Sequence, residues 1–162
     1  MPKKFRIVSG GQTGADQAAL DAALELGIDC GGWCPEDRAS EAGPIPDKYP
    51  VVPLPGAGYR QRTRQNVIDS DATVIISFGA PDGGTRTTVV YCQKKGKPHL
   101  IIDAEITSAL EASRQIKRFV KANHIATLNV AGPRASKHPA IYQYVYETIS
   151  KAVQPRSSRG KQ

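Results

Sequence analysis

Three glycine-rich turns carry hydroxyl groups and could bind an anion. The turns span residues 9–16 (SGGQTGAD), 79–88 (GAPDGGTRTT) and 131–136 (AGPRAS). Glycine lets the backbone approach a phosphate closely, and Ser and Thr hydroxyls donate hydrogen bonds beside it. One such turn is common where a strand leads into a helix, but three in one short chain favour an anion site. The expected ligand-binding residues are Gly10, Gly11, Gln12, Thr13, Gly14, Asp16, Asn66, Gly83, Gly84, Thr85, Thr88, Gly132, Arg134 and Ser136.

Charged and amide side chains could serve the same site. Arg134 follows Gly132 and could hold a phosphate through two hydrogen bonds, although a surface ion pair would explain it equally well. Arg62 and Asn66 are four residues apart, so they share one face of a predicted helix. Asp16 is the candidate catalytic carboxylate. Its place early in a helix also suits ligand binding or a favourable interaction with the helix dipole.

The motifs of three enzyme classes are missing from the sequence. There is no GxxxxGK[ST] motif, which disfavours P-loop ATPases and kinases, and no GxSxG motif of the Ser-His-Asp hydrolases. GGQTGA does not match the GxGxxG fingerprint, and no acidic residue follows a second strand at the distance that would bind a ribose. A hydride-transferring dehydrogenase is therefore disfavoured as well.

The cysteines do not form a metal-binding pattern. Cys30, Cys34 and Cys92 are odd in number, and the spacing of the first two is not the usual one for zinc. We expect reduced thiols and no metal site. Cys30, Trp33 and Cys34 could still contact a pterin or a metal-bound dithiolene, although a Trp among glycines is more often an anchor for its loop.

Length and composition indicate one globular domain. The chain has 162 residues, 40% of them hydrophobic and 23% charged, and no apolar stretch is long enough to cross a membrane. No signal peptide is apparent, so we expect a cytoplasmic protein. The net charge of +7 owes much to residues 151–162, which contain four basic residues and no acidic one. Charge concentrated in a basic tail, expected to be flexible over 154–162, disfavours nucleic-acid binding.

The hydropathy pattern alternates strands with helices. Short apolar runs predict strands at 5–9, 72–77, 99–103 and 127–132. Apolar residues recur with helical spacing after each of these runs, and a further helix is expected over 59–69. Residues 31–58 are rich in Pro and Gly and predict a long ordered loop.

Continuous apolar strands separated by helices predict a mostly parallel sheet that is covered on both faces. The expected fold class is therefore α/β, as a single Rossmann-like three-layer sandwich over residues 1–153. In such a fold the turns that follow the strands gather at one edge of the sheet, where ligands bind. The three glycine-rich turns are accordingly expected to form one site.

Five ordered blocks of sequence resemble a known family. They are SGGQTGAD, CGGWCPEDRASEAGPIPDKYP, YRQRTRQNVIDSDATVIIS, DGGTRTT and LNVAGPRASKHPAIY, within a resemblance that covers about residues 5–153. The chain is similar to the circularly permuted YpsA-like branch of the SLOG superfamily, commonly labelled as molybdenum carrier proteins. This resemblance implies a nucleotide or a nucleotide-derived ligand.

The resemblance also implies a circular permutation relative to other SLOG proteins. DNA-processing protein A, a related member, begins with a strand that ends in a Gly-Ser-Arg turn, and its next strand ends in an SGG turn. Here the SGG turn opens the chain, and the Gly-Pro-Arg turn at 132–134 lies near its end. We therefore expect the strands before these turns to be neighbours, which would bring Arg134 and Ser136 to the turn at 10–11.

One departure from the family's enzymes concerns catalysis. The related phosphoribohydrolases carry a PGGxGTxxE motif whose Glu serves in catalysis, and here Thr88 stands near the position of that Glu. Without this carboxylate, glycosidic cleavage would lose an acid-base or charge-stabilising group. The resemblance thus favours a binding or carrier protein for a phosphorylated nucleotide-like or pterin ligand, with molybdenum cofactor or a nucleotide as the implied cofactors.

Two other functions stay open. The chain could be a nucleotide-processing hydrolase that uses Asp16 and the arginines, or it could bind nucleic acid through its basic tail. We also expect a homodimer or larger assembly, because SLOG relatives commonly dimerise and the last helix carries Tyr142, Tyr144 and Tyr146. No motif in the sequence identifies the ligand.

Overall fold

Five parallel strands form one sheet in the computed structural model, which describes residues 4–154. They lie in the order β2-β1-β9-β7-β8, and each neighbouring pair is parallel. The strands are β1 (Arg6–Val8), β2 (Asp29–Gly31), β7 (Ala72–Ser77), β8 (His99–Asp103) and β9 (Thr127–Ala131). The predicted α/β fold with a parallel sheet is confirmed.

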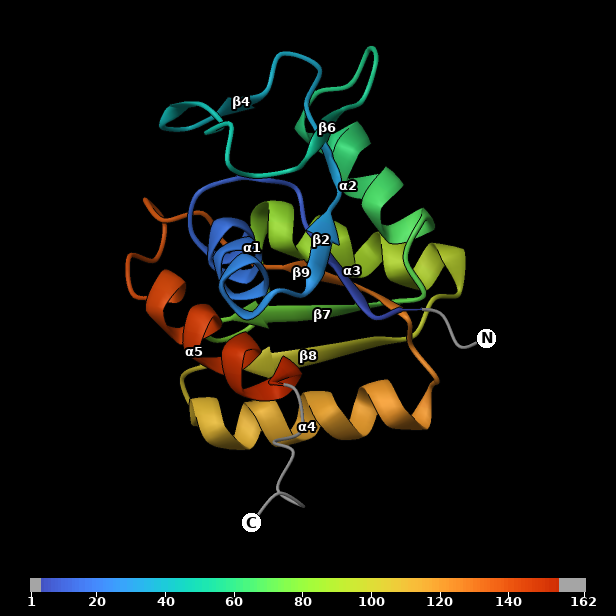
Figure 1. The fold of residues 1–162 in the computed structure, drawn as a ribbon, viewed down its shortest axis with the longest axis vertical. Helices are drawn as coiled ribbons and strands as arrows, with labels where there is room; N and C mark the ends of the chain where they lie inside the picture. Colours follow the sequence, from blue (N-terminus) through green and yellow to red (C-terminus); the bar gives the residue numbers. More distant parts are fainter. Residues whose placement is uncertain (1–3, 155–162) are drawn as a thin grey trace.

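Between residues 4 and 154, five helices cover this sheet on both faces (Figure 1). Helices α1, α4 and α5 pack against one another on one face, and α2 packs beside α3 on the other. The helices are α1 (Ala15–Leu26), α2 (Tyr59–Ile68), α3 (Gly83–Lys95), α4 (Ala109–Ala122) and α5 (Ile141–Val153). The arrangement is the predicted three-layer sandwich.

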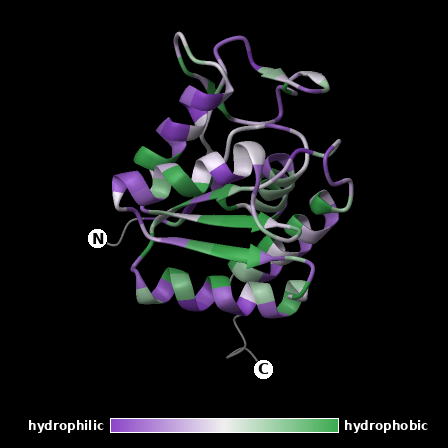
Figure 2. Cartoon of the chain, turned by 180° about the vertical axis from the view of Figure 1, so that it is seen from behind, coloured by the Kyte–Doolittle hydropathy of each residue, from purple (hydrophilic) through white to green (hydrophobic). Residues whose placement is uncertain are grey.

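The core lies between the sheet and its helices. All six residues of β7 are buried, which explains why its sequence, ATVIIS, shows no alternation of polar and apolar residues. Helix α1 turns a stripe of buried alanines inward, and these small side chains let it pack closely against its neighbours. Figure 2 shows hydrophobic residues gathered in the central strands and hydrophilic residues on the outer faces of the helices.

Strand β1, near the start of the chain, pairs directly with β9, near its end. Ile7 lies opposite Leu128 in this parallel pair. The neighbouring position that the permutation predicts for these two strands is confirmed. Since β1, β9 and β7 are consecutive in the sheet, the three glycine-rich turns that follow them share its carboxyl edge. From β1 the chain proceeds to β2 and from β7 to β8, in opposite directions, and such a switch point leaves a crevice for ligands.

The proline-rich segment 31–58 forms short strands above the carboxyl edge. Strand β3 (Trp33–Cys34) pairs in parallel with β6 (Val52–Pro53), and β4 (Ala39–Ser40) pairs antiparallel with β5 (Gly43–Pro44). Arg38 anchors the segment, because its guanidinium donates to four backbone carbonyls in it. The β4–β5 hairpin thus stands on a fixed base, with Glu41 and Ala42 exposed at its tip.

Strand β2 was not predicted from the sequence. Strand β2 has only three residues, Asp-Cys-Gly, too few to give a periodic signal. Most of the basic tail lies beyond residue 154 and so outside the part of the chain that the structure describes. Within the described part, no helix is both long and apolar enough to cross a membrane.

Candidate functional site

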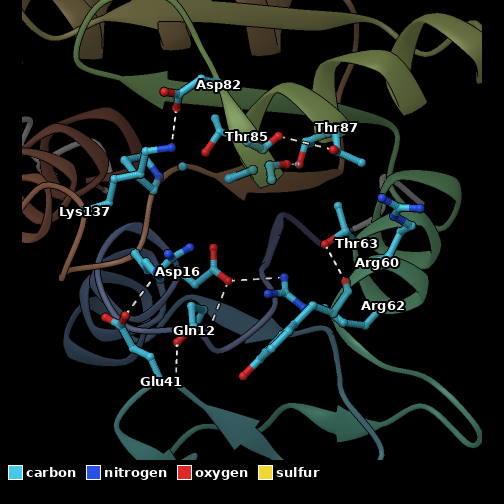
Figure 3. Close-up of a pocket in the computed structure, with 18 residues that line it drawn as sticks. Gln12, Asp16, Glu41, Arg60, Arg62, Thr63, Asp82, Thr85, Thr87 and Lys137 are labelled. Atoms are coloured by element: carbon cyan, nitrogen blue, oxygen red, sulfur yellow. Dashed lines mark hydrogen bonds and ion pairs between the residues drawn. The ribbon is translucent and has the colours of Figure 1, made fainter.

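A cleft of about 550 Å³ opens at the carboxyl edge of the sheet (Figure 3). It lies where the turns after β1, β7 and β9 meet the start of α2 and the tip of the β4–β5 hairpin. Its lining residues are Gln12, Asp16, Glu41, Tyr59, Arg60, Arg62, Thr63, Asp82, Gly83, Gly84, Thr85, Thr87, Thr88, Ala131, Gly132, Pro133, Arg134 and Lys137.

Residues from all three glycine-rich turns line this cleft. The expected ligand-binding residues among its lining are Gln12, Asp16, Gly83, Gly84, Thr85, Thr88, Gly132 and Arg134. The other expected residues are absent from that lining, and they are Gly10, Gly11, Thr13, Gly14, Asn66 and Ser136. For each of these the structure gives a contact within the protein.

The glycines of the first turn make room for other parts of the protein. A Cβ at Gly10 would meet Nη1 of Arg62 at 1.8 Å, and one at Gly14 would meet the carbonyl oxygen of Pro133 at 2.6 Å. Gly14 also has a φ of 82°, which few other residues adopt. At Gly11 a Cβ would meet the Ile45 side chain at 2.9 Å. These glycines let α2, the turn at 132–136 and the loop pack onto the first turn.

Asn66 holds the long loop in place. Its Oδ1 accepts from the backbone N–H of Trp33 at 2.8 Å, and its Nδ2 donates to the Trp33 carbonyl at 3.0 Å. The Trp33 indole N–H donates to Asp69 at 2.8 Å. Trp33 is therefore a loop anchor tied to α2, which is the alternative that the sequence left open for it.

The N-terminus of α3 lies at the cleft, which Gly83, Gly84 and Thr85 line. The helix begins at Gly83, and its first helical hydrogen bond runs from the Arg86 N–H to the Asp82 carbonyl at 3.1 Å. The N–H groups of the residues between them precede that bond, as in any helix start, and carry a partial positive charge. A Cβ built at Gly84 meets nothing within 4 Å, so space is open beside this backbone.

Thr88 does not supply the missing carboxylate chemistry. It is buried, and its hydroxyl donates to the Gly84 carbonyl at 3.3 Å within α3. Thr87 bonds the Gly83 carbonyl in the same way at 3.2 Å. Both hydroxyls therefore stabilise the first turns of α3.

Asp16 and Arg62 form a largely buried ion pair on the floor of the cleft. Figure 3 shows the two side chains facing each other, and Arg62 Nη1 lies 3.4 Å from Asp16 Oδ2. The same carboxylate accepts from the Gln12 N–H at 3.1 Å. Burial raises the pKa of Asp16 above its usual range, and the charge of Arg62 offsets part of that rise. Nε of Arg62 is buried and has no hydrogen-bond partner within the described chain.

Glu41 reaches from the hairpin tip to the turn at 132–136. Its carboxylate accepts from the hydroxyls of Thr13 and Ser136, each at 2.5 Å, and from the Ser136 N–H at 3.0 Å. Arg134 Nε lies 3.2 Å from the same carboxylate. The hydrogen bonds from Ser136 and Thr13 lower the pKa of Glu41, so it is ionised at neutral pH.

Lys137 and Arg60 complete the charged lining. Lys137 Nζ contacts Asp82 Oδ1 at 2.5 Å, and this contact lowers the pKa of Asp82. Arg60 is exposed and forms no ion pair with any residue of 4–154. The cleft is thus rich in hydrogen-bond donors, and three of its cations are held by carboxylates of the protein itself.

The thiols lie apart from the cleft. Cys30, Cys34 and Cys92 are all buried and unpaired by disulfides, and none of them is among its lining residues. Burial raises the pKa of each thiol, which keeps it protonated at neutral pH. Over residues 4–154, no three His, Cys, Asp or Glu side chains are close enough to hold a metal ion.

Sequence reasoning missed several lining residues, namely Glu41, Tyr59, Arg60, Thr63, Thr87 and Lys137. Glu41 lies in a proline-rich loop whose only signal was its length. Lys137 follows directly on the third glycine-rich turn, so extending that turn by one residue beyond Ser136 would have found it. Tyr59 and Arg60 begin the helix on which Arg62 had already been noted.

The tyrosines expected at a subunit interface make contacts within the chain. The hydroxyls of Tyr142 and Tyr146 donate to Asp21 and Glu25 of α1, each at 2.5 Å. That of Tyr144 donates to the Thr107 carbonyl at 2.7 Å. The tyrosines therefore join α5 to its neighbours, and the homodimer stays a prediction.

Comparison with known proteins places the chain in a family. The model of the circularly permutated YpsA SLOG family matches residues 7–153. A solved structure titled "Putative molybdenum carrier protein", from Syntrophus aciditrophicus SB, is 42% identical, with a TM-score of 0.90 over 94% of this chain and 96% of that one. None of the curated proteins compared matches the chain. On the family model and this structure, the chain belongs to the circularly permutated YpsA SLOG family.

Proposed function

We propose that the chain binds a phosphorylated nucleotide-like or pterin ligand in the cleft and serves as its carrier. The observation that carries this proposal is the meeting of the α3 N-terminus, the turn at 132–136 and the arginine-bearing start of α2 around one cleft of about 550 Å³. Pockets for small ligands typically measure roughly 300–1,000 Å³. A mononucleotide or a pterin phosphate suits this size.

The phosphate is assigned to the N-terminus of α3. Backbone N–H groups at a helix start bind anions, because they point at the ligand and add the partial charge of the helix dipole. Gly83 and Gly84 allow close approach to this backbone, and Lys137 Nζ lies beside it, 3.2 Å from where a Cβ on Gly83 would be. These groups would hold a phosphate without any proton transfer.

The ring of the ligand is assigned to Tyr59. This side chain lines the cleft and is 48% exposed, an unusual exposure for so large an aromatic group. Its flat face could stack on a purine or a pterin, an interaction worth about 1–3 kcal/mol where bases stack on aromatic side chains. The Arg62 guanidinium lies 5.9 Å from the Tyr59 ring centre and helps to fix its position.

The similar structure from Syntrophus aciditrophicus is that of a protein named as a molybdenum carrier, and this name supports a carrier function. The cleft of this chain offers N–H, hydroxyl and guanidinium donors and no thiol. Such donors suit the oxygen atoms of a pterin phosphate or of molybdate, and they do not suit direct bonds from sulfur to the metal. The cargo would accordingly be held through its anionic oxygens.

A nucleotide-processing hydrolase is the second candidate, because Asp16 lies in the cleft with a raised pKa. Burial that raises the pKa of a carboxylic acid favours its protonated form, which is the form a general acid needs. The test is release of free base from a panel of nucleoside monophosphates by the wild type and by Asp16→Asn. Release by the wild type that disappears in the variant would defeat the carrier proposal.

The carrier proposal is tested by identifying what copurifies with the protein. Denaturing the purified protein should release one phosphorylated nucleotide or pterin per chain, and mass spectrometry would identify it. Tyr59→Leu should lower its occupancy severalfold, whereas Arg64→Ala, an exposed substitution on α2 outside the cleft, should leave it unchanged. If no small molecule copurifies, and neither nucleoside monophosphates nor molybdate bind in calorimetric titrations, the proposal fails.

A further inference from the structure

The Glu41 carboxylate rests in a ring of donors that resembles a site for an oxyanion. Two hydroxyls and one backbone N–H of Thr13 and Ser136 donate to it at 2.5–3.0 Å, and the Arg134 guanidinium forms an ion pair with it at 3.2 Å. Toward the carboxylate, Thr13 and Ser136 act only as donors, and Arg134 adds a positive charge beside it while its Nε–H donates to Ser136 Oγ at 3.3 Å. A phosphate, sulfate or molybdate group presents the same kind of oxygen acceptors as a carboxylate, with more of them.

The donors belong to the fixed body of the protein. The turn at 132–136 is tied to α1, since the Ala15 N–H donates to the Pro133 carbonyl at 3.2 Å. The Ala135 N–H donates to Thr13 Oγ1 at 3.1 Å, which leaves the hydroxyl hydrogen of Thr13 free to point at the carboxylate. The backbone of the turn that carries Arg134 and Ser136 is therefore held by Thr13 and Ala15, through contacts that do not involve Glu41.

The occupant belongs to the exposed tip of a hairpin. Arg38 and the buried Ile45 hold the base of the β4–β5 hairpin, whereas Glu41 and Ala42 at its tip are exposed. Besides the carboxylate contacts, the tip is joined to the body by the Glu41 N–H, which donates to Gln12 Oε1 at 2.9 Å. The tip could leave the donor ring while the base stays in place.

We infer that Glu41 is an internal stand-in for a second oxyanion group of the ligand, distinct from the phosphate at the N-terminus of α3, and that binding displaces it from Thr13, Arg134 and Ser136 and lifts the β4–β5 hairpin. The inference deepens the proposed function, on which it rests, by giving the cleft a subsite for a tetrahedral oxyanion and a lid that closes when the subsite has no ligand. The group could be a phosphate ester or a free oxyanion such as molybdate, because both offer the same oxygens.

Competition from Glu41 has a measurable consequence. When only a fraction of the protein is in the state that binds the ligand, the apparent affinity is reduced by that fraction. Removing the Glu41 carboxylate, which competes with the ligand, should therefore tighten binding. Glu41→Ala should bind ADP, which carries a second phosphate, sodium sulfate or sodium molybdate at least about fivefold more tightly than the wild type. The matched control is Glu36→Ala, which removes an exposed carboxylate from the same loop outside the cleft and should leave affinity unchanged.

The arms of the titration distinguish the source of the oxyanion. Tightening for ADP alone identifies a phosphate ester, and tightening for molybdate and sulfate identifies a free oxyanion. Adding Ser136→Ala to Glu41→Ala should cancel the gain, because it removes one of the donors of the ring. Hydrogen exchange at residues 40–43 of the wild type should increase when ADP or molybdate binds, since the tip of the β4–β5 hairpin then leaves its hydrogen-bond partners.

Two outcomes would overturn the inference. If Glu41→Ala binds these probes no more tightly than the wild type, or more weakly, Glu41 is a direct ligand contact or a loop anchor, and the carrier proposal stands without the lid. If neither protein binds any of the probes, the proposed function falls together with the inference.

Discussion

The Arg62 guanidinium lies over the backbone of Gly10, so close that no other residue fits at position 10 without displacing it. A Cβ at Gly10 would meet Arg62 Nη1 at 1.8 Å and Cζ at 2.4 Å. This contact sets the Arg62 side chain against Asp16, the carboxylate on the floor of the cleft. Gly10 lies in a turn expected to bind phosphate, but its missing side chain makes room for Arg62.

Gly10→Ala should expel Arg62 and break its ion pair with Asp16. Leaving one partner of a largely buried pair alone costs about 3 kcal/mol, so the free energy of unfolding should fall by about that amount. Chemical denaturation of Gly10→Ala, Arg62→Ala and the double variant measures this. Because both changes remove the same pair, Gly10→Ala should cost little more in the Arg62→Ala background, and additive losses would contradict the account.

Gly84→Ala should separate stability from ligand binding. A Cβ there meets nothing within 4 Å and Gly84 is helical, so alanine should raise the free energy of unfolding by about 0.5 kcal/mol. The same Cβ would hold a phosphate off the backbone N–H groups. Loss of one hydrogen bond to a charged group should weaken AMP binding by about tenfold or more. Unchanged affinity in a calorimetric titration would show that the phosphate does not bind at the α3 N-terminus.

Asp16 should make the protein less stable as pH rises. Its pKa in the folded state lies above the ordinary value of 3.8, first because of burial. Its contribution to stability is therefore fully present below that value and is lost as pH rises through the folded-state pKa. The wild type should lose stability relative to Asp16→Asn as pH rises from 3.8 through the raised folded-state pKa. Denaturation curves at several pH values test this, and a difference that stays constant would refute it.

Glu41 should have the opposite effect. Its hydrogen bonds to Ser136 and Thr13 hold its pKa below the ordinary value of 4.5. Its contribution is present above that value and is lost as pH falls through the lower folded-state pKa. The stability advantage of the wild type over Glu41→Gln should therefore shrink as pH falls from 4.5 through the lowered folded-state pKa. An advantage that grows over this range would show that the carboxylate is not stabilised by those donors.

The sheet and its helices could be predicted because each carries a strong local pattern. The six-residue run ATVIIS is buried on both faces, and α5 repeats apolar residues at helical spacing. The pairing of β1 with β9 came from the resemblance, since no local pattern specifies which distant strands meet. Strand β2 was missed because three residues are too few for periodicity.

The candidate site was predicted in part from the order of the strands. Turns that follow adjacent strands must share an edge, so Asp16, Thr85 and Arg134 could be expected there. The contribution of the long loop could not, because its path depends on contacts between residues far apart in the chain. The Asn66 clamp on Trp33 and the reach of Glu41 to Ser136 are of this kind.

The central claim is that the phosphate of the ligand sits at the N-terminus of α3 within this cleft. Titration of the ¹⁵N-labelled protein with AMP, followed by ¹H–¹⁵N NMR, tests it most directly. We predict saturable shifts that are largest for the amides of Gly83, Gly84 and Thr85. Saturable shifts centred on another surface, or no shifts at millimolar AMP, would contradict the account.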